Sequence, residues 1–131
     1  MSKNAPFKNI AVIGAGTMGS GIAGQIANSE QEVLLLDIPG KTPNSITENA
    51  VKKLIRSDPP ALMHKNKANL IKVGNIRDDF NKLANCDLII EAVVERLDIK
   101  KDLYNRINNI VNSKCVITSN TSTIPIKLLV E

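Results

Sequence analysis

Short apolar runs alternate with amphipathic segments along the chain. Four runs rich in β-branched and aliphatic residues have the length of buried strands: Lys8–Ile13, Glu32–Asp37, Asp87–Val94 and Cys115–Ser119. Three segments carry apolar residues at helical spacing: Met18–Asn28, Asn44–Ser57 and Leu97–Val111. Apolar strands separated by helices predict an α/β fold with a doubly wound, mainly parallel sheet covered on both faces.

The stretch after the second predicted helix has a weaker pattern. Asp58–Pro60 ends that helix, because proline cannot continue a helix interior. Beyond it we expect a short helix over Leu62–Leu70, an extended piece over Ile71–Val73 and a helical turn over Asp79–Leu83. In the last helix, apolar spacing predicts one stripe facing the sheet: Ile99, Leu103, Ile107, Ile110 and Val111.

Length and composition predict one globular domain over residues 1–131. Hydrophobic residues make up 43% of the 131 positions and charged residues 23%. Aromatic residues are only 2%, which argues against a nucleic-acid partner bound by base stacking. No apolar run approaches the roughly 20 residues that span a bilayer, and no secretory signal precedes the first strand. We therefore expect a cytoplasmic protein with no nucleic-acid and no membrane partner.

The chain has two cysteines and one histidine. Cys86 and Cys115 each lie beside an apolar run, and no second ligand stands at metal-binding spacing from either. We expect two buried free thiols and no metal site. His64 stands in a Lys- and Asn-rich stretch and is predicted to be a surface residue.

Positive charge is concentrated between Lys41 and Arg77. Eight Lys and Arg residues stand there with only two acidic residues, whereas the whole chain has a net charge of +4. The segment is either an anion-attracting surface or the solvated face of its helices, and the sequence leaves both interpretations open.

The candidate chemistry follows the predicted strands, because open α/β sheets bind ligands at the carboxyl ends of their strands. Gly14–Gly19 (GAGTMG) follows the first strand, opens a helix and precedes an acid, Asp37, by 18 positions. Gly14 permits a tight turn, Gly16 lets the backbone approach a pyrophosphate, and Gly19 lets the helix pack close to the strand. The first N–H groups of the helix then face the phosphates. A glycine turn without a ligand is the alternative.

Two further strand ends carry charged residues. A carboxylate at Asp37 can accept hydrogen bonds from an adenosine ribose and would repel a 2′-phosphate, so we expect NAD rather than NADP; alternatively, Asp37 opens the turn at Pro39–Gly40. Glu91 and Glu95 end the third long run, and Glu95 is better placed to reach a ligand. Lys100 follows five residues later. Alternatively, Glu95 complements a helix dipole and Lys100 belongs to a solvated face.

Four ordered motifs together resemble the NAD-binding domain of L-3-hydroxyacyl-coenzyme A dehydrogenases. They are GAGTMGSGIA (Gly14–Ala23), Leu36–Asp37, IEAVVE (Ile90–Glu95) and SNTS (Ser119–Ser122). The resemblance implies a Rossmann-type fold that binds NAD, in a family that oxidises the 3-hydroxyl of acyl-CoA thioesters in fatty-acid β-oxidation. It also implies an acyl-CoA substrate for the complete enzyme, with the positive segment along the coenzyme A entrance.

The resemblance assigns roles to site residues as well. The glycine loop and Asp37 would hold the adenosine half of NAD, and Glu95 and Lys100 would contact the cofactor farther along. Ser122 would lie near both the nicotinamide and the substrate. The cofactor-binding candidates are therefore Gly14, Gly16, Thr17, Met18, Gly19, Asp37, Glu95, Lys100, Asn120 and Ser122.

The family's catalytic histidine is expected beyond Glu131. In the family it stands in a His-Phe-Phe-Asn-Pro-like segment shortly after the motif matched by Asn120–Ser122, and a helical second domain follows it. We therefore expect a chain truncated before that domain and incomplete for catalysis, with little or no turnover on its own. The expected partners are a missing catalytic domain or a second copy of the chain.

Two other functions are compatible with the sequence. A non-catalytic nucleotide-binding or assembly module would keep the fold and associate through an exposed sheet edge. The cofactor domain of another NAD-dependent hydroxyacid dehydrogenase would also open with a glycine loop and a following acid. The motifs at Glu91–Glu95 and Asn120–Ser122 weigh against that second alternative.

Overall fold

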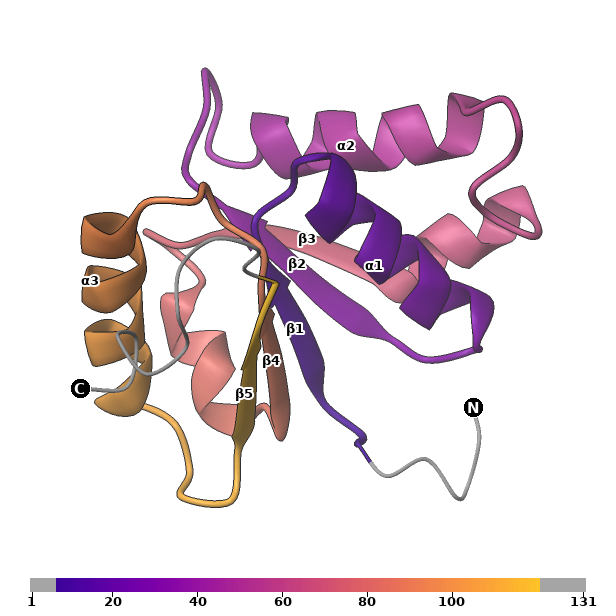
Figure 1. Cartoon of the computed structure of the whole chain (residues 1–131). Helices are drawn as coiled ribbons and strands as arrows, with labels where there is room; N and C mark the ends of the chain where they lie inside the picture. Colours follow the sequence, from indigo (N-terminus) through magenta and orange to yellow (C-terminus); the bar gives the residue numbers. More distant parts are fainter. Residues whose placement is uncertain (1–6, 121–131) are drawn as a thin grey trace.

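A computed structural model describes residues 7–120 of the chain, which form a parallel sheet with helices on both faces (Figure 1). The strands are β1 (Ile10–Ile13), β2 (Val33–Asp37), β3 (Ile71–Asn75), β4 (Leu88–Glu91) and β5 (Val116–Ser119). The α-helices are α1 (Thr17–Asn28), α2 (Ser45–Arg56) and α3 (Leu97–Asn108), and the 3₁₀ helices are η1 (Lys65–Leu70) and η2 (Phe80–Asn85).

The five strands are all parallel and lie in the order β3-β2-β1-β4-β5. β1 is central, with Ile13 opposite Leu36 of β2 and Glu91 of β4. The strand order therefore reverses between β1 and β4, and this switch point opens the crevice in which doubly wound sheets bind ligands. The predicted fold class is confirmed.

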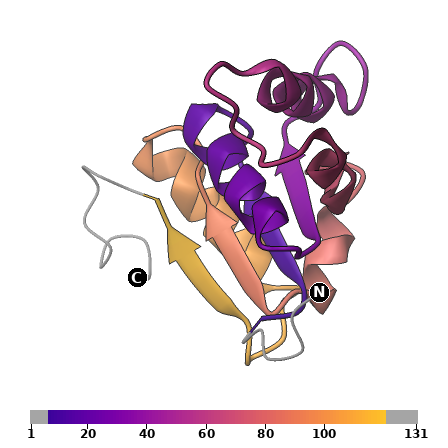
Figure 2. The same cartoon turned by 90° about the vertical axis from the view of Figure 1, so that its right-hand side faces the viewer.

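Each face of the sheet has its own apolar core. Alternate residues of β1 point to opposite faces: Val12 packs in the core beneath α1, α2 and η1, whereas Ala11 and Ile13 pack in the core beneath α3 and η2. The two helical layers are visible in Figures 1 and 2. With helices on both sides, continuous apolar strands are the sequence pattern that such a sheet requires.

Several element bounds differ from the predicted ones. β4 ends at Glu91 rather than Val94, because the Glu91 carboxylate accepts a hydrogen bond from the Val93 N–H and turns the chain out of the sheet. β3 continues to Asn75, because its partner β2 pairs with it along its whole length. The helix predicted over Leu62–Leu70 is a 3₁₀ helix that begins only at Lys65.

The prediction for α3 is wrong in two respects. The helix ends at Asn108, so Ile110 and Val111 lie beyond it, although both pack against the core. The inward stripe is also wrong at Ile99. Leu103 and Ile107 are buried as expected, but Ile99 is 38% exposed, and Lys100 and Tyr104 are buried in its place. The helix is rotated so that this polar pair faces the sheet, where Glu91 offers a carboxylate to both side chains.

The cysteines and the histidine lie outside the strand-end crevice. Cys86 is buried, whereas Cys115 is only half-buried because it precedes the edge strand β5. Both are free thiols. His64 is exposed, as predicted, and its Nδ1 accepts a hydrogen bond from the Asn66 N–H at the start of η1. Among the described residues, no helix is both long and apolar enough to cross a membrane.

Candidate functional site

A cavity of about 780 Å³ opens at the carboxyl ends of the strands. It lies between the glycine loop, the ends of β2 and β3, the chain after β4, and one face of α3. Six of the predicted cofactor-binding residues line it: Gly14, Gly16, Thr17, Met18, Asp37 and Asn120. Its volume is within the range of small-molecule and cofactor sites.

The three loop glycines have different surroundings. Gly14 has φ +110°, and a Cβ there would collide with the Ala92 carbonyl. A Cβ at Gly19 would collide with the Gly14 carbonyl. A Cβ at Gly16, in contrast, would meet no protein atom within 4 Å. Gly14 and Gly19 are thus required by the fold, whereas the space beside Gly16 is open to a ligand.

The amino terminus of α1 faces the cavity through Thr17 and Met18. Gly16 is the N-cap in an extended conformation; no side chain of the described residues caps the helix, and its first turn contains no acid. Ser20 instead fastens the turn, because its N–H and hydroxyl both donate to the Gly16 carbonyl, at 2.9 and 2.7 Å. An uncapped helix start with N–H groups toward a cavity favours an anion such as phosphate.

Asp37 connects the end of β2 to the glycine loop. Its Oδ2 accepts the Ala15 N–H at 2.7 Å, and its Oδ1 accepts the Ile38 N–H at 2.7 Å. The residue is half-buried and lines the cavity. Because a carboxylate has about four acceptor sites, two remain to accept hydroxyl groups of a ligand.

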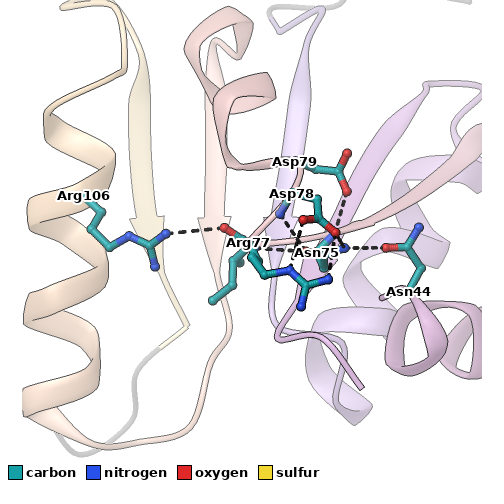
Figure 3. Close-up of polar contacts among 7 residues, drawn as sticks. Asn44, Asn75, Arg77, Asp78, Asp79 and Arg106 are labelled. Atoms are coloured by element: carbon teal, nitrogen blue, oxygen red, sulfur yellow. Dashed lines mark hydrogen bonds and ion pairs between the residues drawn. The ribbon is translucent and has the colours of Figure 1, made fainter. Parts of the chain in front are cut away.

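One face of α3 forms the opposite wall. Four of its residues, at the i, i+3, i+4 and i+7 spacing of a helical face, line the cavity: Ile99, Asp102, Leu103 and Arg106. The Arg106 guanidinium lies 4.3 Å from the centre of the Phe80 ring. Arg106, labelled in Figure 3, also donates to the Ile76 carbonyl at 3.4 Å. This wall was not predicted from the sequence, although the spacing of its four residues along the helix could have revealed it.

A polar corner after β3 holds the loop that carries Ile76, another cavity residue. The buried Asn75 amide donates to Asn44 at 2.8 Å and to Asp78 at 3.1 Å, and its Oδ1 accepts the N–H groups of Arg77 and Asp78 (Figure 3). The corner thereby fixes β3 to the start of α2, and the cavity wall is preformed.

Two of the remaining candidates lie outside the cavity, whereas Asn120 lines it. Glu95 and Lys100 do not line the cavity but form an ion pair with each other, at 3.0 Å between Lys100 Nζ and Glu95 Oε1. Lys100 is completely buried, so its interpretation as a solvated residue is wrong. The backbone N–H of Asn120 donates to the Glu91 carbonyl at 2.7 Å. Ser122 lies outside the described residues.

The positive segment from Lys41 to Arg77 covers α2, η1 and the chain around them, and seven of its eight Lys and Arg residues are exposed. The eighth, Lys67, is half-buried and forms an ion pair with Glu30, while Arg77 pairs with Asp78. No residue of this segment other than Ile76 lines the cavity among the described residues. The anion-attracting and solvated interpretations therefore both stay open.

Comparison with known proteins agrees with this geometry. Residues 9–131 match the model of the family described as 3-hydroxyacyl-CoA dehydrogenase, NAD binding domain. A Rickettsia felis protein described as a candidate fatty acid oxidation complex trifunctional enzyme is 46% identical over 128 residues. A Deinococcus radiodurans protein described as a probable 3-hydroxyacyl-CoA dehydrogenase is 43% identical over 128 residues. The crystal structure of (S)-3-hydroxybutyryl-CoA dehydrogenase PaaH1 from Ralstonia eutropha superposes with a TM-score of 0.77 at 30% identity.

These relatives are much longer than the chain. The matches cover 95% of this chain but 18% of the R. felis protein and 37% of the D. radiodurans protein, and the R. eutropha match covers 94% of this chain and 44% of that one. The matched part contains the glycine loop, the acid that ends β2 and the strand-end cavity. The chain therefore belongs to the family of NAD-binding domains of 3-hydroxyacyl-CoA dehydrogenases, which are oxidoreductases, and its cofactor is NAD.

Proposed function

We propose that the chain binds NAD for hydride transfer between this cofactor and 3-hydroxyacyl-CoA thioesters in fatty-acid β-oxidation. The observation that carries the proposal is the cavity in which Gly16, the uncapped start of α1 and Asp37 converge. Relatives named as 3-hydroxyacyl-CoA dehydrogenases and as fatty acid oxidation proteins support the choice of substrate class.

The residues around the cavity fit the two ends of the adenosine half of NAD. Asp37 would accept hydrogen bonds from the ribose and repel a 2′-phosphate, so NAD is bound in preference to NADP. Gly16 and the first turn of α1 would hold the pyrophosphate. When bound, NAD supplies the hydride acceptor. The second half of the molecule would lie over β4 and β5, beside Asn120.

The base of the resembled family is a histidine, and among the described residues no histidine lines the cavity. The chain's single histidine is His64, which is exposed at the start of η1 and does not line the cavity. General acid–base catalysis contributes about 10²–10⁴-fold to such reactions. We infer that the chain has little or no dehydrogenase activity alone and works with a further catalytic domain.

Calorimetry with NAD and NADP tests cofactor binding, and NADH oxidation with acetoacetyl-CoA tests turnover. We expect saturable NAD binding, weaker NADP binding, and no acetoacetyl-CoA-dependent oxidation above a control without protein. If a folded chain binds neither dinucleotide, the cavity is not a cofactor site. Saturable turnover would mean that a base other than His64 reaches the cavity.

The edge strand β5 supports one other function. It is paired only with β4 among the described residues, and Val116 is 43% exposed. An unpaired parallel edge favours association with another chain, so the alternative is a nucleotide-binding assembly module. Association without any contribution to acyl-CoA reduction would favour that alternative.

The free thiols Cys86 and Cys115 are consistent with a reducing compartment such as the cytoplasm.

A further inference from the structure

A buried polar cluster lies behind the cavity, between β4, β5 and α3. We call Glu91, Glu95, Lys100, Tyr104 and Ser119 the Glu91 cluster. The side chains of Glu91 and Lys100 are 0% exposed, and that of Glu95 is 31% exposed. Burying a charge is unfavourable unless the charge is paired and hydrogen-bonded. The burial of these charged groups therefore has to be explained by their partners or by a function.

The Glu91 carboxylate connects three elements. Its Oε1 accepts the Ser119 hydroxyl of β5 at 2.6 Å and the Tyr104 hydroxyl of α3 at 3.2 Å. Its Oε2 accepts the Val93 N–H, in the chain leaving β4, at 2.9 Å and lies 3.2 Å from Lys100 Nζ. Burial raises the pKa of Tyr104 to about 12, so its hydroxyl stays protonated and remains a donor.

Lys100 joins the buried acid to the more exposed one. Its Nζ lies 3.2 Å from Glu91 Oε2 and 3.0 Å from Glu95 Oε1. Within the described residues, neither contact has the angles of a hydrogen bond. The ammonium group is therefore held by charge on both sides, and its position depends on both carboxylates.

The cluster lies under the half of the cavity that is remote from Asp37. Glu91 is the last paired residue of β4, in register with Ile13 of β1 and Ser119 of β5. Ile13, Val93 and Asn120, the residue after Ser119, all line the cavity. A dinucleotide with its adenosine at Asp37 and its pyrophosphate at α1 extends its second half over this region of the sheet.

Resting on the proposed NAD binding, we propose that Glu91 is a positioning residue for the nicotinamide half of the cofactor. It fixes Lys100, which in turn fixes Glu95 between Val94 and Arg96, two residues that line the cavity. Through Val93 and Ser119 it also fixes the chain after β4 and at the end of β5, where Val93 and Asn120 line the cavity. The adenosine half would instead lie at Asp37, the end of β2, and at the start of α1.

The test compares NAD with ADP, which carries the adenosine and pyrophosphate groups but lacks the second nucleoside. In Glu91→Gln, which keeps the shape and removes the charge, calorimetry should show NAD affinity reduced about tenfold or more and ADP affinity changed less than about twofold. Asp87→Asn is the matched control. Asp87 lies just before β4, at the other end of that strand, and its carboxylate accepts the N–H groups of Lys8 and Asn9. This variant should leave both affinities unchanged.

A second variant tests whether Glu91 acts through Lys100. Lys100→Met should itself weaken NAD binding. Adding Glu91→Gln to it should reduce the NAD affinity by less than a further factor of about two, because the effects of substitutions at coupled residues are not additive. Full additivity of the two substitutions would overturn the proposed route. If Glu91→Gln fails to fold, Ser119→Ala is used in its place, because it removes one hydrogen-bond donor to Glu91 and keeps the ion pairs. It should lower the NAD affinity about threefold and leave the ADP affinity unchanged.

The outcomes separate this inference from the proposed function. If the unmodified chain does not bind NAD, the proposed function fails and this inference fails with it. If the unmodified chain binds NAD, and the Glu91 or Ser119 variants change NAD and ADP affinities equally or not at all, Glu91 is only a structural residue. A loss confined to NAD supports the positioning role.

Discussion

Replacing Gly16 by valine separates the ligand-binding role of the glycine loop from its structural role. A Cβ at Gly16 meets no protein atom within 4 Å, and the backbone there is extended, a conformation that valine adopts readily. Valine is a poorer N-cap than glycine, by about 1 kcal/mol, but it restricts the unfolded chain, which returns about 0.4–1 kcal/mol. The free energy of unfolding should therefore change by less than about 1 kcal/mol.

The same substitution should strongly reduce the affinity for NAD. An isopropyl group would occupy the space that the pyrophosphate requires, and overpacking costs about 1–3 kcal/mol, or roughly 5- to 150-fold in affinity. Gly21→Val is the matched control, because a Cβ at Gly21 also meets nothing within 4 Å but lies one turn further along α1. Gly14→Ala should instead lower the free energy of unfolding by more than about 2 kcal/mol, since it combines a positive φ with a backbone collision.

Urea unfolding and NAD calorimetry on the three variants decide the matter. We expect a stable Gly16→Val that binds NAD weakly, a stable Gly21→Val that binds normally, and an unstable Gly14→Ala. If the NAD affinities of Gly16→Val and Gly21→Val agree within twofold, the loop does not hold the pyrophosphate. If Gly16→Val is as unstable as Gly14→Ala, the space beside Gly16 is not open.

Three further predictions follow from individual side chains. Asp37→Asn should lower the affinity for NAD about tenfold, because a hydrogen bond to a charged group contributes about 1.5–3 kcal/mol. It should also bring the NAD and NADP affinities closer together. If calorimetry shows an unchanged ratio of the two affinities, Asp37 does not bind the ribose. Burial raises the pKa of Cys86 to about 11, so iodoacetamide should label the more exposed Cys115 first at pH 8, and equal rates in the folded chain would contradict this. Tyr104 has a pKa of about 12 when folded against 10.0 as its ordinary value, so the unfolded chain loses that proton first. The free energy of unfolding should accordingly fall by about 2 kcal/mol between pH 10 and 12 in the unmodified chain but not in Tyr104→Phe. Urea unfolding at each pH measures this fall, and the absorbance of the single tyrosine reports its ionisation.

The fold was largely predictable because its signals are local. Strand runs such as Ile10–Ile13 are apolar on both faces, and only a sheet covered on both sides buries such a run completely. The turn after the first strand was also predictable, because the positive φ of Gly14 requires glycine. Strand ends were less predictable: β4 stops at Glu91 although apolar residues continue to Val94, since the bond between the Glu91 side chain and the Val93 N–H is not visible in a hydrophobic pattern.

The face of α3 was mispredicted for a related physical reason. Apolar spacing treats Ile99 as an inward residue and Lys100 as an outward one, yet Lys100 is completely buried. Lys100 faces inward because the Glu91 carboxylate lies on the sheet beneath it, and an ion pair makes burial of the lysine tolerable. Ile99, released from the core, becomes part of the cavity wall. A single-sequence pattern cannot reveal this exchange, because it depends on which residue of β4 lies beneath the helix.

The two acids that end β2 and β4 show how the same sequence feature takes different roles. Asp37 and Glu91 each close an apolar strand. Asp37 lines the cavity, and its carboxylate accepts two backbone N–H groups, which leaves further acceptor sites for a ligand. Glu91 lies under α3 and meets side-chain donors, so its carboxylate is wholly used within the protein. We therefore expect the acid at the open strand end, Asp37, to contact the ligand directly. We expect the acid beneath the helix, Glu91, to act on the ligand only through other residues.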